Sequence, residues 1–241
     1  MADGTAAVDG FAPSTHAFAF TNDFPRQPLL RIPLPGPLPP IPLGDASRGL
    51  CGGMIYTVRD LYEAGLPPPP DLTPPAEDSP LYAYIVRRLF DSFDLPAGVV
   101  RYYQLMASPD ADVAHSVLSL RGIGRISAVD EWPRIRLDID QGVLSPLGVI
   151  VPRSLDPFQL GINHQVLAYA YSQNRGSVTL RVYDPNTPTE RGDDAVISFD
   201  VARPGSGMPI RHNLSIGGRP VRGFFRSRYR FRSPDELVKR S

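Results

Sequence analysis

The hydrophobic positions of this 241-residue chain follow two different periods. From about Cys51 to Gln141, apolar residues recur every three to four positions, which is the spacing of one face of a helix. After Gln141, short runs of β-branched and aromatic residues alternate with turn formers, a pattern typical of strands. Helices followed by strands predict an α+β fold, with an N-terminal helical layer packed on a C-terminal antiparallel β-sheet.

Start and stop signals place the helices within the first half. One helix is expected to begin at Cys51 and to end at Gly65, because Pro67 beyond it cannot continue a helix. A second is expected where Ser79 can cap the first turn and Pro80 can occupy the first helical position. Further helices are expected over residues 96–106, 113–120 and 132–142.

The strands are expected in five short runs, over residues 146–152, 164–171, 177–184, 195–201 and 221–231. The last run alternates arginine with aromatic residues, so a strand there places Phe225, Tyr229 and Phe231 on one face and the arginines on the other. Such a surface resembles one that binds nucleic acid or an acidic partner. A strand with its aromatic face in the core explains the same pattern, so nucleic acid is an unlikely partner.

Proline is the outlier of the composition, with 28 residues. We expect residues 1–28 to be a flexible lead-in and residues 29–241 to form a single domain. Within that domain, the proline-dense residues 29–44 are expected to form an extended strap. Residues 45–141 are expected to be mainly helical and residues 142–241 mainly β.

Charge and cysteine content narrow the classes of function. The 25 basic and 25 acidic residues cancel, which removes any global attraction for nucleic acid or an anionic membrane. The sequence predicts neither a cleaved signal peptide nor a membrane span, so we expect a soluble protein, cytoplasmic or exported without such a signal. The single cysteine excludes an internal disulfide and a multi-cysteine metal site. No metal and no other cofactor is expected, and the sequence does not indicate an oligomeric state.

That single cysteine, Cys51, lies in "GLCGGM" at the expected start of a helix. A thiol attacks as thiolate, and the N-terminal end of a helix favours the thiolate through its free N–H groups and positive dipole. Gly49, Gly52 and Gly53 would let a substrate backbone approach, and the backbone N–H of Cys51 could donate to an oxyanion. The alternative is that Cys51 is a small buried hydrophobic residue.

A nucleophilic cysteine requires a base, normally a histidine. His164 opens the apolar run "HQVLAYAY", where its ring could project from the end of the sheet toward the helix that carries Cys51. Asp184 and Asn186 follow the next expected strand, and either side chain could orient the imidazole. Asp184 is favoured, because Asn186 lies farther into the turn, where an asparagine commonly bonds its own backbone.

This order of residues resembles the papain-like cysteine peptidase superfamily. "NHQVLAYAY" is similar to the histidine strand of papain-type enzymes, and "YDP" is similar to the aspartate motif of the bacteriocin-processing branch. The resemblance implies a papain-like fold and a thiol hydrolase that uses Cys51, His164 and Asp184 on a peptide or protein substrate. Asn186 is the alternative orienting residue, because the superfamily contains both Asp and Asn.

Two features of the superfamily are missing from the chain. The glutamine that donates to the oxyanion several residues before the cysteine has no equivalent in "LGDASRG", and Gly52 and Gly53 stand where a tryptophan commonly follows. Asn22 is the candidate oxyanion donor, if the proline segment folds it back toward the cysteine. Three alternatives remain: a transglutaminase-like acyltransferase, a deamidase, and a papain-fold protein that binds without catalysis.

Overall fold

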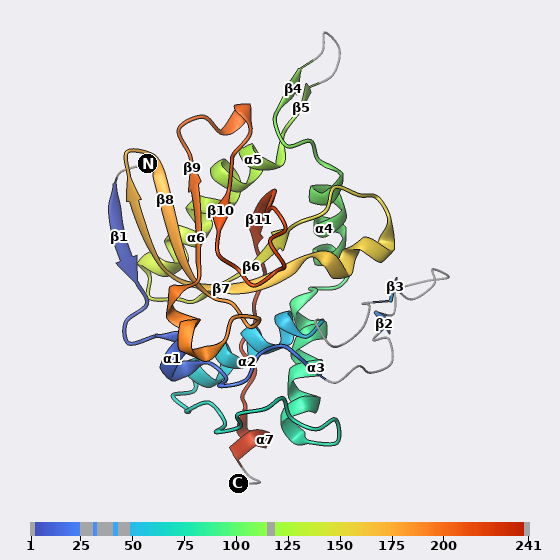
Figure 1. Cartoon of the computed structure of the whole chain (residues 1–241), viewed down its shortest axis with the longest axis vertical. Coiled ribbons are helices and arrows are strands. Elements are labelled where there is room, and N and C mark those ends of the chain that lie inside the picture. The colour runs from blue at the N-terminus through green and yellow to red at the C-terminus, as the bar shows by residue number, and fades with distance from the viewer. Residues whose placement is uncertain (1–2, 25–30, 33–40, 43–48, 115–118, 239–241) are drawn as a thin grey trace.

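A seven-stranded antiparallel sheet lies at the centre of the molecule, with helices on both of its faces (Figure 1). The computed structural model describes residues 3–24, 31–32, 41–42, 49–114 and 119–238. The sheet order is β10-β9-β8-β7-β6-β11, and β1 also pairs with β7. The α+β class with an antiparallel sheet, expected from the sequence, is confirmed. The strands are β1 (Gly4–Ala7), β6 (Ser145–Ile150), β7 (His164–Asn174), β8 (Ser177–Tyr183), β9 (Val196–Asp200), β10 (Arg211–His212) and β11 (Gly223–Arg226).

The long strand β7 is buried on both sides, which explains why its sequence is an almost unbroken apolar run. Leu167 and Tyr169 belong to the core that packs against the helices of the first half. Val166 and Ala168 point the opposite way, into a second core around Trp132. The sheet is therefore a middle layer, and β7 contacts helices on both of its faces.

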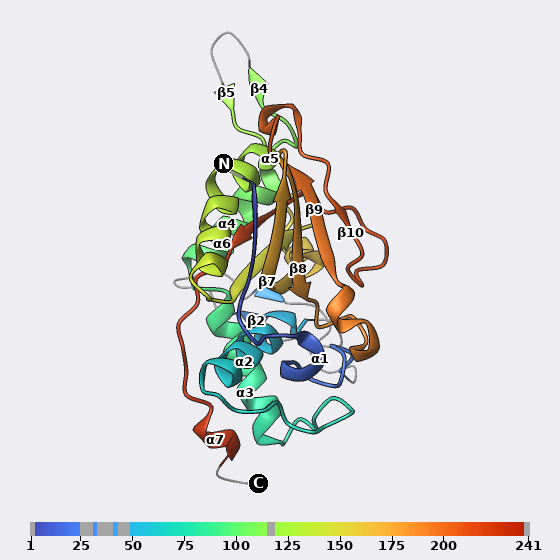
Figure 2. The same cartoon turned by 90° about the vertical axis from the view of Figure 1, so that its left-hand side faces the viewer.

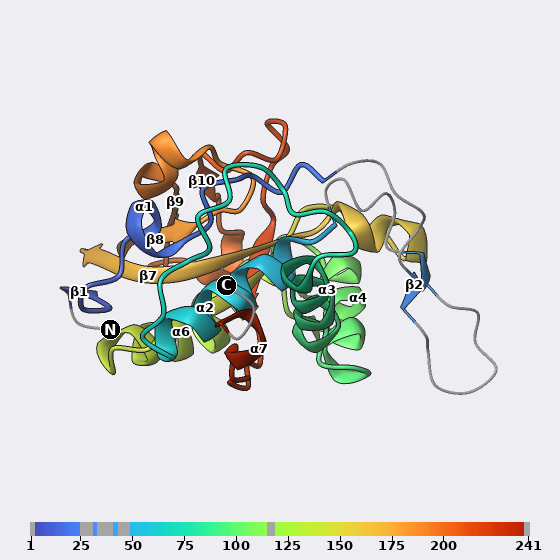
Figure 3. The ribbon, with the colours of Figure 1, turned by 90° about the horizontal axis from the view of Figure 1, so that it is seen from below.

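The helices of the first half follow the predicted start signals. Ser79 caps its helix by accepting a hydrogen bond of 3.1 Å from the backbone N–H of Tyr82. The helix that begins at Cys51 runs beside this capped helix, and Figure 3 shows both below the sheet. The principal helices are α2 (Cys51–Glu63), α3 (Pro80–Ser92), α4 (Ala97–Ala107) and α6 (Trp132–Asp140), the last preceded by α5 (Ile123–Arg125) and the π-helical η2 (Ile126–Glu131). In the described part of the chain, no helix has the length and apolar character needed to cross a bilayer.

The prediction of a flexible lead-in was wrong for residues 4–24. β1 pairs with the C-terminal half of β7, with Gly4 opposite Gln173. A short helix, α1 (Pro13–His16), follows, and four phenylalanines of this segment are buried in the core. These aromatic anchors hold the segment: Phe11, Phe18, Phe20 and Phe24. Most of the expected proline strap, residues 29–44, lies outside the described residues, which include only β2 (Arg31–Ile32) and β3 (Ile41–Pro42).

Two other segments differ from the pattern-based expectation. Where a helix was predicted over 113–120, the described residues form a small hairpin of β4 (Val113–Ala114) and β5 (Ser119–Leu120). The strand predicted over 221–231 stops at Arg226, so Phe231 is exposed rather than placed in the core. Beyond this strand the chain leaves the sheet and passes the helices to α7 (Asp235–Val238), as Figure 2 shows.

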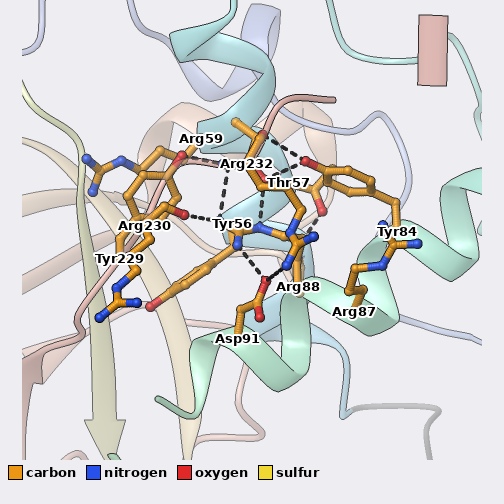
Figure 4. Close-up of polar contacts among 12 residues, drawn as sticks. Tyr56, Thr57, Arg59, Tyr84, Arg87, Arg88, Asp91, Tyr229, Arg230 and Arg232 are labelled. Atoms are coloured by element: carbon orange, nitrogen blue, oxygen red, sulfur yellow. Dashed lines mark hydrogen bonds and ion pairs between the residues drawn. The ribbon is translucent and has the colours of Figure 1, made fainter. Parts of the chain in front are cut away.

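This departure has a physical cause in a buried polar cluster that joins α2, α3 and the C-terminal segment (Figure 4). The Asp60 carboxylate on α2 is fully buried, and its Oδ2 lies 2.7 Å from Nε of the equally buried Arg88 on α3. Tyr229 donates its hydroxyl hydrogen to Asp60 Oδ1 at 2.7 Å, and the backbone N–H of Arg232 donates to the same oxygen at 3.1 Å. If residues 227–231 continued the strand, Tyr229 and Arg232 would stay at the sheet and could not reach Asp60.

We expect Arg88→Leu to lower the free energy of unfolding by about 3–5 kcal/mol, because it leaves the buried Asp60 carboxylate without its cation. The matched control is Arg87→Leu on the same helix, since the ion pair of Arg87 with Glu236 is half exposed and contributes under about 1 kcal/mol. Urea unfolding of both variants measures the difference. Equal losses in the two variants would show that the buried pair has no special role.

Candidate active site

Cys51 is the first residue of α2 and is buried, with 6% of its surface exposed. The backbone N–H of Met54 donates to the carbonyl of Leu50, which precedes the helix, at 2.9 Å. The N–H groups of the first turn therefore have no acceptor within the helix, and the helix dipole places partial positive charge at the thiol. The local environment is the one expected from the sequence.

His164 and Asp184 meet because their two strands are antiparallel neighbours. His164 is the first residue of β7, Asp184 directly follows β8, and Leu167 lies opposite Tyr183 in the register. The start of β7 and the end of β8 consequently share one edge of the sheet. His164 Nε2 lies 2.8 Å from Asp184 Oδ1, so the expected contact is present.

The other side of the imidazole faces the thiol. The Cys51 side chain lies close enough to the His164 ring to help raise the pKa of the imidazole. Because Nε2 is bonded to Asp184, Nδ1 is the nitrogen left for the sulfur. The structure thus brings together the three predicted residues in the order thiol, imidazole, carboxylate.

Several groups besides His164 fix the Asp184 carboxylate. Oδ2 accepts hydrogen bonds from the backbone N–H of Ser215 at 2.8 Å and from the Thr187 hydroxyl at 2.9 Å. Oδ1 also accepts from the backbone N–H of Asn186 at 2.9 Å. A buried carboxylate with this many donors is held in one orientation and is stabilised in its ionised form.

The opposite charges of His164 and Asp184 stabilise each other. Burial on its own would lower the pKa of His164, but the Asp184 carboxylate and the contact with Cys51 outweigh it and raise that pKa well above its usual range. Burial would likewise raise the pKa of Asp184, but His164 and the surrounding donors lower it to about 2. Both shifts favour the charged forms, an imidazolium beside a carboxylate.

Asn186, the alternative orienting residue, has a different position. Its side chain donates to the backbone carbonyl of Ser215 at 3.2 Å and accepts from Asn22 Nδ2 at 3.0 Å. The side chain that bonds His164 is that of Asp184. Asn186 contributes to the site through its backbone N–H and by holding Asn22.

Asn22 reaches the site, but with the wrong end of its amide free for the predicted role. Its backbone N–H donates to Pro185 at 2.8 Å, and its Nδ2 is bonded to Asn186. The carbonyl oxygen Oδ1 is buried and has no partner among the described residues. Asn22 lies with His164 on the wall of a cavity of about 550 Å³. An oxyanion needs a donor, so this oxygen cannot serve the predicted role.

Gln165, which the sequence analysis did not single out, is also part of this site. Its side chain is buried, and its Nε2 donates to Ser92 Oγ at 3.1 Å. A Cβ on Gly52 would lie 2.3 Å from Ser92 Oγ and 2.4 Å from Gln165 Nε2. A polar residue inside the apolar run of β7 is the signal that could have identified it.

The glycines after Cys51 therefore serve packing rather than the approach of a substrate. Gly52 leaves space for Gln165 and Ser92, as described above. At Gly53, a Cβ would lie 2.1 Å from the backbone oxygen of Ile85. This glycine allows α2 and α3 to approach each other closely.

The two other histidines among the described residues, His16 and His212, lie outside the site. His16 bonds its neighbour Thr15, and His212 bonds the backbone oxygen of Arg219. His115 lies outside the described residues. Within the described residues, no group of three or more His, Cys, Asp or Glu side chains is arranged to hold a metal ion.

Comparisons with protein-family models, with curated proteins and with solved structures gave no match to this chain. The chemistry of the site therefore rests on its own geometry.

We expect Asp184→Asn to destabilise the protein most between about pH 4 and 6.5. These limits are the ordinary pKa values of an aspartate and a histidine side chain. In the native protein the raised pKa of His164 adds stability that is complete below pH 6.5 and is lost as the pH rises through the folded value. The lowered pKa of Asp184 adds stability above its ordinary value, which is lost as the pH falls toward 2. The difference in unfolding free energy between the two proteins should therefore shrink at alkaline pH. Chemical denaturation at pH 5, 7 and 9 measures it, and a constant difference would contradict the paired charges.

Proposed function

We propose that the protein is a papain-like thiol hydrolase that cleaves a peptide or amide bond with Cys51, His164 and Asp184. The observation that carries this proposal is the double contact of His164, with the buried Asp184 carboxylate on one side and the chain's single thiol on the other. The position of that thiol at the start of a 13-residue helix supports it.

The reaction proceeds through a thioester. The Cys51 sulfur attacks the carbonyl carbon of the substrate, and the thiol proton resides on His164. The backbone N–H of Cys51 donates to the developing oxyanion. His164 then protonates the leaving nitrogen, the C–N bond breaks, and the acyl group remains on sulfur.

The second half of the reaction uses the same groups in reverse. His164, now neutral, takes a proton from water, which attacks the thioester carbon and breaks the C–S bond. Asp184 stays ionised throughout and stabilises the imidazolium in each half. Its role is to orient the ring, since three other donors fix the carboxylate.

The activated thiol can be tested without a known substrate. We expect iodoacetamide to alkylate Cys51 in the native protein faster at pH 6 than in the urea-unfolded protein, because the imidazolium stabilises the thiolate. His164→Ala should reduce the native rate by about tenfold or more, whereas His212→Ala, a change at a histidine outside the site, should leave it unchanged. Native alkylation no faster than that of the unfolded chain would refute the proposal.

Acyl transfer is the second candidate, because the same thioester can be attacked by an amine instead of water. Incubation with a peptide mixture and a fluorescent primary amine separates the two reactions. A hydrolase produces free acids, and a transferase incorporates the amine. In either case Cys51→Ser should abolish product formation, and product that persists in this variant would rule out thiol catalysis.

A further inference from the structure

The orientation of the Gln165 amide is fixed by a chain of hydrogen bonds. The hydroxyl of Ser92 donates to the backbone carbonyl of Leu89 at 2.7 Å, so its oxygen is free to accept. Gln165 Nε2 is the donor to that oxygen, at 3.1 Å. The opposite end of the amide, Oε1, is buried and has no hydrogen-bond partner in the part of the chain that the structure describes.

An acceptor without a donor is unusual in a folded interior, where nearly all buried polar atoms are paired. Here the unpaired oxygen belongs to a side chain on the wall of the cavity that contains Cys51. The amide of Gln165 packs against the backbone of Gly52, the residue next to the nucleophile. A substrate that brings an N–H to this place would complete the pairing.

The size of the cavity limits what can carry that N–H. The cavity around Cys51 and Gln165 measures about 20 Å³, and its wall includes the apolar side chains of Leu89, Phe93 and Leu160 beside Tyr102. This volume has room for about one water-sized group. The cavity of about 550 Å³ beside His164 shares Gly161 and Asn163 with it, and has room for the rest of a substrate.

From this arrangement we propose that the favoured substrate is a primary carboxamide, such as the side chain of a glutamine or asparagine residue in a peptide. Its NH₂ group enters the small cavity and donates to Gln165 Oε1, while its acyl part lies in the larger cavity. This assignment rests on the proposed thiol chemistry and names its substrate. Gln165 is then a positioning residue that recognises the leaving group.

The reaction on such a substrate is a deamidation. The Cys51 sulfur bonds to the carboxamide carbon, the C–N bond breaks, and the nitrogen leaves as ammonia with the proton that His164 supplies. Water then adds to the thioester carbon, the C–S bond breaks, and the carboxylic acid and the thiol are released. One carboxamide and one water are converted to one acid and one ammonia.

Two small alkylating reagents test the recognition directly. 2-Chloroacetamide carries an NH₂ group, and N,N-dimethyl-2-chloroacetamide carries none. Each alkylation rate of native Cys51 is divided by the rate of the same reagent on unfolded protein, which removes intrinsic reactivity. We expect the native protein to prefer 2-chloroacetamide by about tenfold after this correction, the effect of one buried hydrogen bond and of the excluded methyl groups.

Variants identify the group responsible. Gln165→Met has nearly the same size but no acceptor, and should lose the part of the preference that comes from the hydrogen bond. Gln165→Glu keeps an acceptor oxygen and should retain it. The matched control is Gln173→Met, because Gln173 is a buried glutamine at the other end of β7 whose Oε1 accepts from Trp132 Nε1. This control should keep the preference, and near-ultraviolet circular dichroism checks that all variants are folded.

A peptide mixture tests the reaction itself. The protein is incubated with peptides of reduced casein. Mass spectrometry then counts the glutamine or asparagine residues converted to acid and the new chain ends. Converted amides that disappear in Cys51→Ser support the proposal. A reactive Cys51 without reagent preference, or cleaved peptide bonds without converted amides, overturns the carboxamide assignment but leaves the thiol hydrolase intact. A Cys51 no more reactive than in the unfolded chain overturns both.

Discussion

The position of Cys51 depends on the buried carboxylate of Asp60. This residue lies on the same helix as Cys51, and burial raises its pKa despite the nearby Arg88. Its negative charge is tolerated only because Arg88, Tyr84, Tyr229 and the backbone of Arg232 surround it. Those partners come from α3 and from the C-terminal segment. The carboxylate therefore fixes the position of α2 against two other parts of the chain.

A helix is stiff over 13 residues, so an anchor near its end determines where its beginning lies. The close approach of Gly53 to Ile85 supplies a second fixed point two residues from the thiol. The position of the His164 imidazole is also fixed, because the strand that carries it, β7, is buried on both faces. A slip of its register by one residue would exchange the faces of His164 and Gln165 and would remove both from their partners. The site is thus a junction between a helix and a strand that each have one permitted position.

Much of this arrangement could be predicted from the sequence, because it follows local rules. The start of α2, the Ser79 cap and the strand order around His164 and Asp184 rest on periodicity, capping and turn residues. What the sequence did not reveal depends on contacts between distant segments. The phenylalanines of residues 11–24 could not be assigned to the core from the sequence, because this segment looks irregular until β7 is placed beside it. The unpaired oxygen of Gln165 is visible only after Ser92 and Leu89 are placed, since their hydrogen bonds determine which end of the amide remains free.

The buried cluster around Asp60 also has a consequence for the order of events during synthesis. Cys51 is made before the strand that carries His164, and Tyr229 and Arg232, which anchor its helix, lie 169 and 172 residues after Asp60. Contacts of such long sequence separation form late in folding, after their loop entropy has been lost. A nascent chain therefore contains the thiol before its imidazole neighbour and before its helix is fixed. The candidate site can assemble only after the segment with Tyr229 and Arg232 has been made, so the thiol and the imidazole are held in place only by a chain that has passed Arg232.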